Sequence, residues 1–379
     1  MYAEQKSPAK PGGPRQRLAE ALAAIRAYAD AKNVKISARR YGVDAMGAMA
    51  QGLFASLLIG TILNTAGTQL GLELLTQMGG FASSVAGPAM AVSIGFALNA
   101  PALVLFSLIT VGQAANSLGG AGGPLAVLVI AILACEAGKL VSKETKVDIL
   151  VTPVVTILIG IGAAWIIAPP IGGAADAFGQ LIMRTTELQP FFMGILVSVL
   201  VGIALTLPIS SAAICSVLGL TGLAGGAAVA GCCANMVGFA VMSFRENRWG
   251  GLVSQGIGTS MLQMPNIVKN PKIWLPAILT SAITGPLATC VFRLEMNGDP
   301  INSGMGTCGL CGQLGVWTGW VNPSAKAIAN GASAIVPGAF DWLGLILISF
   351  VLPAVLCWAF GLFFRKIGWI REGDLVLPQ

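Results

Sequence analysis

Residues 258–320 of this chain read GTSMLQMPNIVKNPKIWLPAILTSAITGPLATCVFRLEMNGDPINSGMGTCGLCGQLGVWTGW, and this stretch decides the fold. Prolines and glycines interrupt it repeatedly, at Pro265, Pro271, Pro276, Pro286 and Pro300 and at Gly304, Gly306, Gly309, Gly312 and Gly315. Irregular backbone at membrane depth survives only where protein or a water-filled cavity covers it, because lipid offers no hydrogen-bond partners. We therefore expect the substrate site in this stretch.

The composition around it is that of an integral membrane protein. Of 379 residues, 55% are hydrophobic and only 10% are charged, against roughly 25% charged in an average soluble domain. Apolar runs of about 20 residues recur, each long enough to cross a bilayer as a helix. Such runs argue against a β-barrel, whose strands alternate over short segments. With 49 glycines and 20 prolines, we predict an all-α, polytopic fold with closely packed and broken helices.

The positive charge lies at the ends of the chain. Nine of the 22 Lys and Arg residues precede position 41, and Arg365, Lys366 and Arg371 follow the last apolar run. By the positive-inside rule both termini are cytoplasmic and the number of crossings is even. We expect a multi-pass membrane protein that contacts lipid and no nucleic acid.

The chain has no histidine. This excludes His-based acid–base catalysis, a phosphohistidine and His-ligated metal on this chain. Cys308 and Cys311 form a C-x-x-C, which together with Cys232 and Cys233 offers four thiolates for a metal or redox site. The alternative, which we favour, is reduced structural thiols in apolar surroundings. We expect no catalytic residue, no metal and no cofactor.

The apolar runs divide the chain as follows. Residues 1–40 form a cytoplasmic tail whose part 15–35 is a basic amphipathic helix on the leaflet surface. Residues 41–170 form a first membrane half, 171–190 an interfacial linker, 191–365 a second membrane half, and 366–379 a cytoplasmic tail. We predict about ten spans plus re-entrant hairpins, the spans covering 43–65, 81–115 as two helices broken at Asn99–Pro101, 124–141, 148–167 ending at Pro169-Pro170, 191–207, 223–244, 250–264, 273–291 and 340–364.

The run SGMGTCGLCGQLG from Ser303 contains G-x-G-x-x-G. A dinucleotide site would need a preceding strand in a βαβ unit, and the sequence shows none. We interpret the run as a tight re-entrant loop in which Gly304 and Gly306 let backbone N–H groups approach a solute. Ser303, Thr307 and Gln313 add side-chain partners. The alternative is that these glycines only allow helices to pack closely.

Amides and one acid complete the candidate substrate contacts. Gln263, Asn266 and Asn270 donate and accept hydrogen bonds as a hydroxyl-rich solute requires, although loop capping explains the asparagines equally well. Glu295 is the candidate carboxylate, because an ionisable group beside an irregular membrane loop suggests function. The alternative is a surface ion pair between Arg293 and Glu295.

The segments MPNIVKNPKIWLPAILTSAITGPLATCVFRLE and SGMGTCGLCGQLG resemble membrane IIC permeases of the bacterial phosphoenolpyruvate-dependent sugar phosphotransferase system, in the divergent toxin-regulator-like branch. The Asn270-Pro271 and Pro276 positions and the loop Gly304–Gln313 carry the likeness. It implies a homodimeric inner-membrane transporter that holds a sugar between a scaffold and a mobile part and presents it to a IIB protein. Better-known members place a His and a Glu at the sugar, whereas this chain has no His, and separate IIA and IIB proteins are the expected partners.

We therefore predict a permease of IIC type that moves a small polar solute, expected to be a sugar, by alternating access. Two other functions stay open on the residues alone. One is a membrane sensor or regulator that binds a solute without carrying it, which would suit the basic N-terminal helix. The other is a secondary transporter that is not coupled to phosphorylation.

Overall fold

The computed structural model describes residues 14–377, and within them the chain is built from helices. A single antiparallel bridge between Gly222 and Met296 is the nearest approach to β-structure in this range. The all-α class is therefore confirmed. The expected tail before residue 14 lies outside the described residues.

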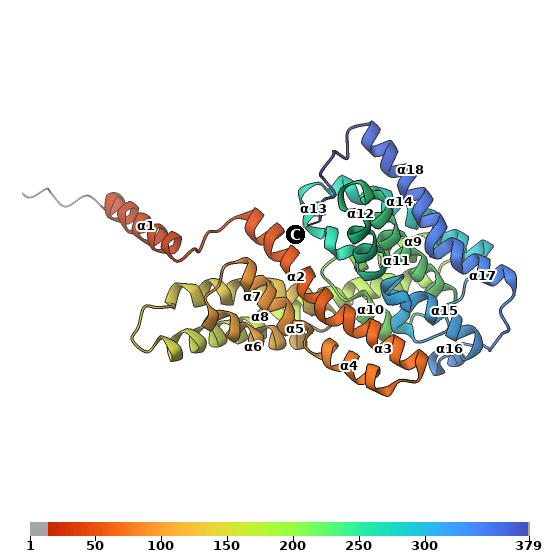
Figure 1. Ribbon diagram of the computed structural model, residues 1–379, viewed down its shortest axis with the longest axis horizontal. Helices are drawn as coiled ribbons and strands as arrows, with labels where there is room; N and C mark the ends of the chain where they lie inside the picture. The colour runs from red at the N-terminus through yellow and green to blue at the C-terminus, as the bar shows by residue number, and fades with distance from the viewer. Residues whose placement is uncertain (1–13, 378–379) are drawn as a thin grey trace, which may run out of the picture.

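The first half of the chain forms the left part of Figure 1. Its helices are α1 Pro14–Ala31, α2 Met46–Leu53, α3 Ile59–Leu70, α4 Glu73–Ser84, α5 Ala86–Ala97, α6 Ala102–Gly119, α7 Gly123–Val141 and α8 Asp148–Thr186. Helices α3 and α4 run along the lower edge of the molecule in this view. Short π-helical turns at 40–45 and 54–58 join α2 and α3 into one continuous helical run, Arg40–Leu70.

Helices α6, α7 and α8 form a three-helix layer. The chain reverses after α6 at Gly120, whose φ of +50° suits glycine. As a result Val104, near the start of α6, lies beside Gly138, near the end of α7. Helix α8 then runs back along both, and its Gly172 approaches the backbone of Gly119. Glycine at these contacts lets the helices pack without hindrance from a Cβ atom.

The second half is more fragmented and forms the body at the right of Figure 1. Its helices are α9 Pro190–Thr206, α10 Ser211–Leu218, α11 Gly222–Met242, α12 Phe244–Val253, α13 Met264–Lys269, α14 Leu275–Pro286, α15 Cys311–Val321, α16 Ala325–Ala329, α17 Ala339–Ile346 and α18 Leu352–Lys366. Short 3₁₀ or π-helical turns extend α14 at both ends and join α17 to α18.

Helix α11 is the axis of this body and packs against α9, α14 and α18. Its small side chains allow backbone to meet backbone: a Cβ on Gly231 would collide with the carbonyl of Ser198 in α9. In the same way, a Cβ on Gly285 of α14 would collide with the carbonyl of Gly194. Helices α9, α11 and α14 are thus locked together at distances that only glycine permits.

Within residues 14–377, six helical stretches are long and apolar enough to cross a membrane: Arg40–Leu70, Ala102–Val141, Asp148–Thr186, Gly222–Met242, Pro271–Val291 and Ala339–Lys366. One of these, Ala102–Val141, is the folded-back pair α6 and α7. Helices α4 and α5 pass the same test only as a pair bent by 50°, and α9 is a shorter apolar helix. The predicted break at Asn99–Pro101 is confirmed, because α5 ends at Ala97 and α6 begins at Ala102.

Two predicted boundaries were wrong. Helix α8 does not end at Pro169-Pro170 but continues to Thr186, so it includes most of the segment that we expected to be an interfacial helix or linker. Both prolines face outward, where the lost backbone hydrogen bonds do not disturb the packed side that rests on the α6–α7 turn. Residues 250–264, expected to span, instead turn back at Thr259, whose extended backbone interrupts the helix.

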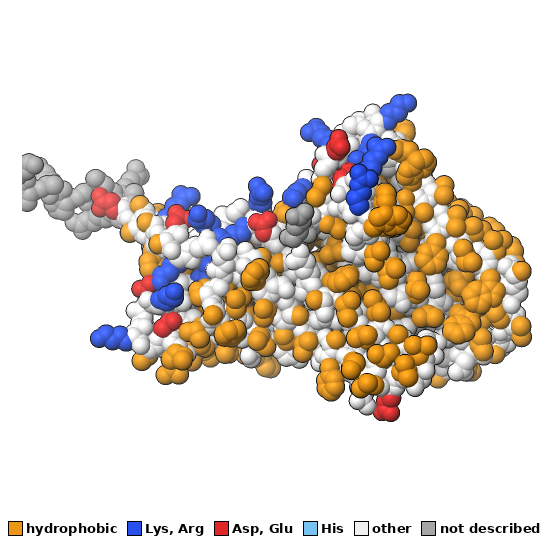
Figure 2. All heavy atoms as spheres, viewed as in Figure 1, with side chains coloured by type: hydrophobic (Ala, Val, Ile, Leu, Met, Phe, Trp, Pro, Cys, Tyr) orange, Lys and Arg blue, Asp and Glu red, His pale blue; other side chains and the backbone are white. Residues whose placement is uncertain are grey.

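The charged residues mark one side of the molecule. Figure 2 shows Lys and Arg gathered along the upper and left edges, while hydrophobic side chains cover the right-hand part. Helix α1 is tied to this charged side by Lys32, which pairs with Glu144 and donates to the carbonyl of Ser142 at 2.6 Å. The Tyr28 hydroxyl adds a bond of 2.6 Å to the carbonyl of Leu140.

Candidate functional site: the meeting point of two hairpins

The first re-entrant hairpin comprises residues 244–270. It enters through α12, turns at Gly258–Ser260 and returns through α13. Gln263 Nε2 donates to Gln255 Oε1 at 2.8 Å, and this bond joins the returning arm of the hairpin to the entering arm. Gln255 in turn donates to Ser243 Oγ at 2.8 Å, at the end of α11.

The second re-entrant hairpin comprises residues 297–321. It enters after Glu295, turns at Gly304–Leu310 and returns through α15. Its two arms touch backbone to backbone, because Gly298 lies against Gly315 and Gly319. The turn closes with a bond of 2.9 Å from the N–H of Gly312 to the carbonyl of Gly306, whose φ is +54°.

The two hairpins enter from opposite ends of α11. The first begins beside Ser243, whereas the second begins where Met296 pairs with Gly222. Helix α11 has 21 residues and at 1.5 Å per residue spans about 31 Å, the thickness of the hydrocarbon core. Both turns reach its middle: Gly306 packs on Cys232 and Cys233, and Ser260 is bonded through Thr206 to Asn235.

A third break completes the meeting point. Helix α9 ends at Thr206, one residue before Leu207-Pro208, and the chain resumes as α10 at Ser211. Ser211 Oγ donates to the carbonyl of Gly304 at 2.7 Å, so this break is bonded directly to the turn of the second hairpin.

A cavity of about 60 Å³ lies between the three breaks, and we call it the tip cavity. Its lining comes from α2 with the following turn, from α7, from the α9–α10 break and from both hairpin turns: Leu53, Leu57, Leu58, Pro124, Leu205, Ile209, Ser210, Ser211, Ala212, Gly258, Thr259, Met261, Gly304, Met305 and Cys308. Small-molecule sites are commonly about 300–1,000 Å³. The tip cavity is therefore too small for a sugar in this conformation and holds no more than a few waters.

A buried polar network surrounds Asn235, in the middle of α11. Its Oδ1 accepts from Trp274 Nε1 at 2.9 Å and from Thr206 Oγ1 at 3.2 Å, while its Nδ2 donates to Ser281 Oγ at 3.3 Å. Thr206 also bonds Ser260 at 2.8 Å, which connects the network to the turn of the first hairpin. Polar side chains at this depth need such partners, because lipid offers none.

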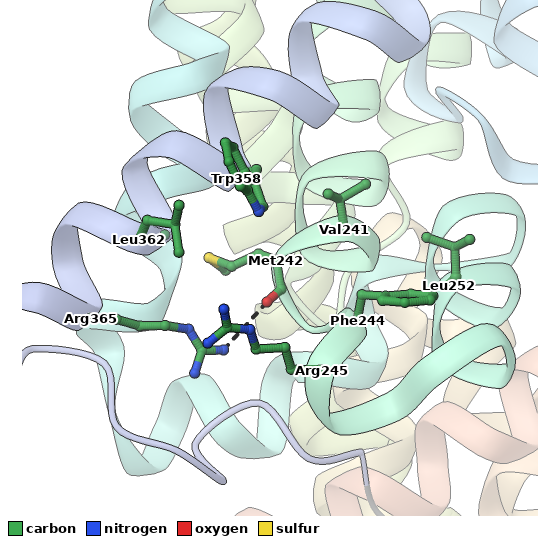
Figure 3. Close-up of a pocket in the computed structure, with 9 residues that line it drawn as sticks. Val241, Met242, Phe244, Arg245, Leu252, Trp358, Leu362 and Arg365 are labelled. Carbon is green, nitrogen blue, oxygen red and sulfur yellow. Dashed lines mark hydrogen bonds between the residues drawn. The ribbon is translucent and has the colours of Figure 1, made fainter.

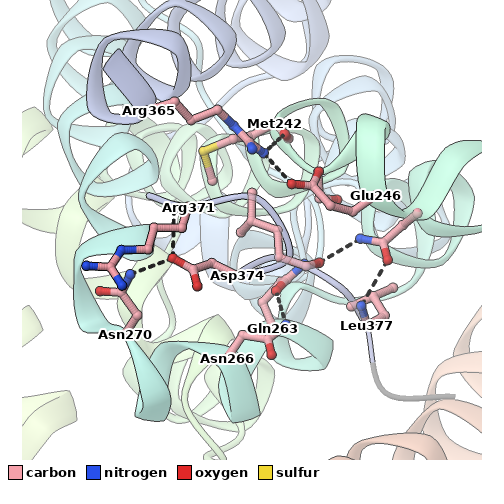
Figure 4. A network of polar contacts seen from close by, with 12 residues as sticks. Met242, Glu246, Gln263, Asn266, Asn270, Arg365, Arg371, Asp374 and Leu377 are labelled. Carbon is pink, nitrogen blue, oxygen red and sulfur yellow. Dashed lines mark hydrogen bonds and ion pairs between the residues drawn. The ribbon is translucent and has the colours of Figure 1, made fainter. Parts of the chain in front are cut away.

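The three amides expected to hold a solute hold the C-terminal segment instead (Figure 4). Gln263 Nε2 donates to the carbonyl of Leu375 at 3.0 Å, and Asn266 Nδ2 donates to the carbonyl of Val376 at 2.7 Å. Asn270 Nδ2 donates to Asp374 Oδ2 at 2.9 Å. These amides therefore line the charged side of the first hairpin, away from its turn.

Asn247 strengthens the same attachment from the entering arm. Its Nδ2 donates to the carbonyl of Leu375 at 2.7 Å, and its Oδ1 accepts from the N–H of Leu377 at 2.9 Å. Leu375 and Ile370 are buried. Residues 369–377, which turn at 372–375, are thus bound to both arms of the first hairpin.

The side-chain candidates on the second hairpin, Ser303, Thr307 and Gln313, do not line the tip cavity. Ser303 Oγ donates to the carbonyl of Pro300 at 2.7 Å, and Thr307 Oγ1 contacts Met236 Sδ at 3.6 Å. Gln313 Nε2 contacts Cys233 Sγ at 3.2 Å, while its Oε1 is buried without a partner. Among the candidates of the sequence, Gly304 is the one in the cavity wall.

Glu295 is separate both from the amides that bind the C-terminal segment and from the candidates near the turn of the second hairpin. It lies at the entrance of the second hairpin, where its Oε2 accepts from Asn297 Nδ2 at 2.9 Å. The ion pairs within residues 14–377 do not join it to Arg293. Asn297 Oδ1 also accepts from the N–H of Gly222, so this carboxylate supports the junction of the second hairpin with α11.

Sequence reasoning missed the hydroxyls that line the tip cavity, Ser210, Ser211 and Thr259. Pro208 marked the break that carries the first two, but no pattern connects that break to residues 258–320. Within the described residues all eight cysteines are unpaired, and no group of three or more His, Cys, Asp or Glu side chains is placed to hold a metal.

The family described as phosphotransferase system, EIIC, matches residues 43–377. The chain belongs to this family. The match covers both re-entrant hairpins, the α9–α10 break and the bound C-terminal segment, so it includes every part of the candidate site. Neither the curated proteins nor the solved structures contain a match to the chain. Family membership and the apolar helices together establish a multi-pass membrane permease of the phosphotransferase system.

Proposed function

We propose that this EIIC permease carries a sugar across the membrane by alternating access, with the tip cavity as the closed form of the sugar site. Three interrupted helices converge there in the middle of the membrane body, and transporters bind substrate at such interruptions. The convergence of the two hairpin turns with the α9–α10 break is the observation that carries the proposal.

The contacts around the cavity indicate which parts separate. Phe54 and Ile62, on the run that includes α2 and α3, pack against Gly258 and Gly309 in the two turns. Thr65 Oγ1 contacts Cys311 Sγ at 3.3 Å. These are side-chain contacts, in contrast to the backbone contacts that lock α9 to α11 and α14. Movement of the α2–α3 run relative to the turns would enlarge the cavity to the size of a sugar.

Opening would expose hydroxyls and backbone as sugar ligands. Ser211, Thr259 and Gly304 lie in the wall. Gly306, Ser303, Thr307 and Gln313 are buried nearby on the second hairpin and would join the site only as the cavity enlarges. Gln263, Asn266 and Asn270 would reach a solute only after release of residues 369–377. In this proposal Glu295 stabilises the junction of the second hairpin with α11 and does not contact the sugar.

We further propose a homodimer in the bacterial inner membrane with both termini in the cytoplasm. The clustering of Lys and Arg along one side supports this orientation by the positive-inside rule. Separate IIA and IIB proteins would phosphorylate the sugar at that side, because this chain contains no histidine to carry a phosphoryl group.

Uptake of a panel of labelled sugars into proteoliposomes, with and without cytoplasmic phosphorylating components, tests the function. We expect uptake of one sugar class to require those components and to fall severalfold in Ser211→Ala and Thr259→Val. Thr68→Val is the matched control, because the Thr68 hydroxyl bonds only within its own helix at an exposed position. Uptake without the components would indicate a secondary transporter. Sugar binding without uptake would indicate a sensor.

A further inference from the structure

A groove lies at the charged end of α11 and α18, outside the sugar site. It has a volume of about 330 Å³ and is lined by Val241, Met242, Phe244, Arg245, Leu252, Trp358, Gly361, Leu362 and Arg365. A second hollow of about 590 Å³ shares Arg245 and Arg365 with it and continues toward Arg371. The two hollows meet at these arginines. The first is apolar along α18, and the second is charged, because Glu246 and Glu372 lie among its lining residues together with the three arginines.

The two arginines point into the same space below Trp358 (Figure 3). Arg365 is already engaged, because it pairs with Glu246 at 2.7 Å and donates to the carbonyl of Met242 at 3.3 Å. Arg245 is exposed and belongs to none of the ion pairs within residues 14–377. Of the two arginines that line the first hollow, Arg245 is therefore the one outside these ion pairs, and Arg371 in the second hollow is outside them too.

The apolar part opens toward the bilayer. Trp358 and Leu362 lie on α18, a candidate membrane span, and are 54% and 38% exposed. Trp249 and Trp369 are also exposed near this end of the body. Tryptophan is enriched where hydrocarbon meets headgroups, so the basic end of the groove lies at headgroup level and its apolar walls lie at acyl-chain level.

We propose that this groove is a binding site for an anionic phospholipid. Its phosphate would lie against the guanidinium groups of Arg245 and Arg365, and one acyl chain would follow Val241, Trp358 and Leu362. Basic pockets between membrane helices on the cytoplasmic side suit anionic headgroups. A soluble anion would match the arginines but leave the apolar walls unused.

Purified protein in nanodiscs of phosphatidylcholine with a minority of phosphatidylglycerol tests the site, with retained lipid counted by native mass spectrometry. We expect Arg245→Gln to reduce retained phosphatidylglycerol about fivefold, the loss for one interfacial cation. Lys366→Gln is the control, because Lys366 is exposed and neighbours Arg365 without lining the groove. Arg245 is exposed and unpaired, so its replacement should not impair folding.

Leu362→Trp, which narrows the apolar part, should reduce retention of phosphatidylglycerol while leaving the charge unchanged. Equal losses in Arg245→Gln and Lys366→Gln would mean general surface attraction and would overturn the proposal. The same holds if Arg245→Gln retains the lipid fully, or if glycerol phosphate displaces phosphatidylglycerol as effectively as another anionic phospholipid does.

Discussion

Replacement of Asn235 by alanine tests the polar network in the middle of the body. The side chain makes three bonds to other segments, with Thr206, Trp274 and Ser281. Interhelical hydrogen bonds in membranes contribute about 0.6 kcal/mol each on average, because the unfolded chain in lipid also finds partners. With three such bonds removed, we expect Asn235→Ala to lower the free energy of unfolding by about 2 kcal/mol. A soluble core would lose more, since each unpaired buried group there costs about 1–3 kcal/mol.

Equilibrium unfolding in mixed micelles measures this loss, with Asn64→Ala as control. Asn64 is exposed on α3, and its replacement should change the free energy of unfolding by less than about 0.5 kcal/mol. A double-mutant cycle with Trp274→Phe isolates one bond, and we expect a coupling of about 0.6 kcal/mol, at most about 1.7. The reasoning is refuted if Trp274→Phe lowers the free energy of unfolding by the same amount with and without Asn235. It is also refuted if Asn235→Ala changes that free energy no more than Asn64→Ala does.

Three further predictions concern packing, thiols and pH. Gly231→Ala should prevent folded protein from accumulating, because its Cβ would collide with the Ser198 carbonyl; size-exclusion chromatography after extraction measures this. Maleimide should label one thiol per folded chain, Cys290, because the other seven are buried; intact mass before and after unfolding counts the labels. The hydrogen bond from Lys32 lowers the pKa of Glu144, so its stabilising effect is present at neutral pH and lost as pH falls through that lowered pKa. The protection factors of amides in α1, which correct hydrogen exchange for its intrinsic dependence on pH, should fall at acid pH, and Lys32→Ala should remove that response.

The sequence was sufficient for the fold class and for locating the broken segment. Apolar runs of membrane length are local features, so spans such as Gly222–Met242 and Pro271–Val291 could be predicted closely. Pro169-Pro170 misled the prediction because a helix tolerates prolines on an outward face when its other side is packed. That tolerance depends on neighbours the local sequence does not reveal.

The candidate site was harder to predict because its parts are distant in the sequence. Glycines at 304 and 306 indicated the second turn, and the second turn does reach the middle of α11. The amides at 263 and 266 looked like solute ligands because their bonding capacity is visible in the sequence, while their actual partners, Leu375 and Val376, lie more than 100 residues away. Tertiary pairing of this kind has no local pattern.

The glycine contacts make α9, α11 and α14 one rigid unit. The movement of other segments can be measured as a distance from that unit. Cys290, just beyond α14, is the exposed native thiol of that unit and needs no engineering to carry a spin label or fluorophore. A second label at exposed Leu70, the last residue of α3, would report on the run that packs against both hairpin turns. Two probes would then suffice to test, in a native-like bilayer, whether this run moves relative to the α9–α11–α14 unit as we propose.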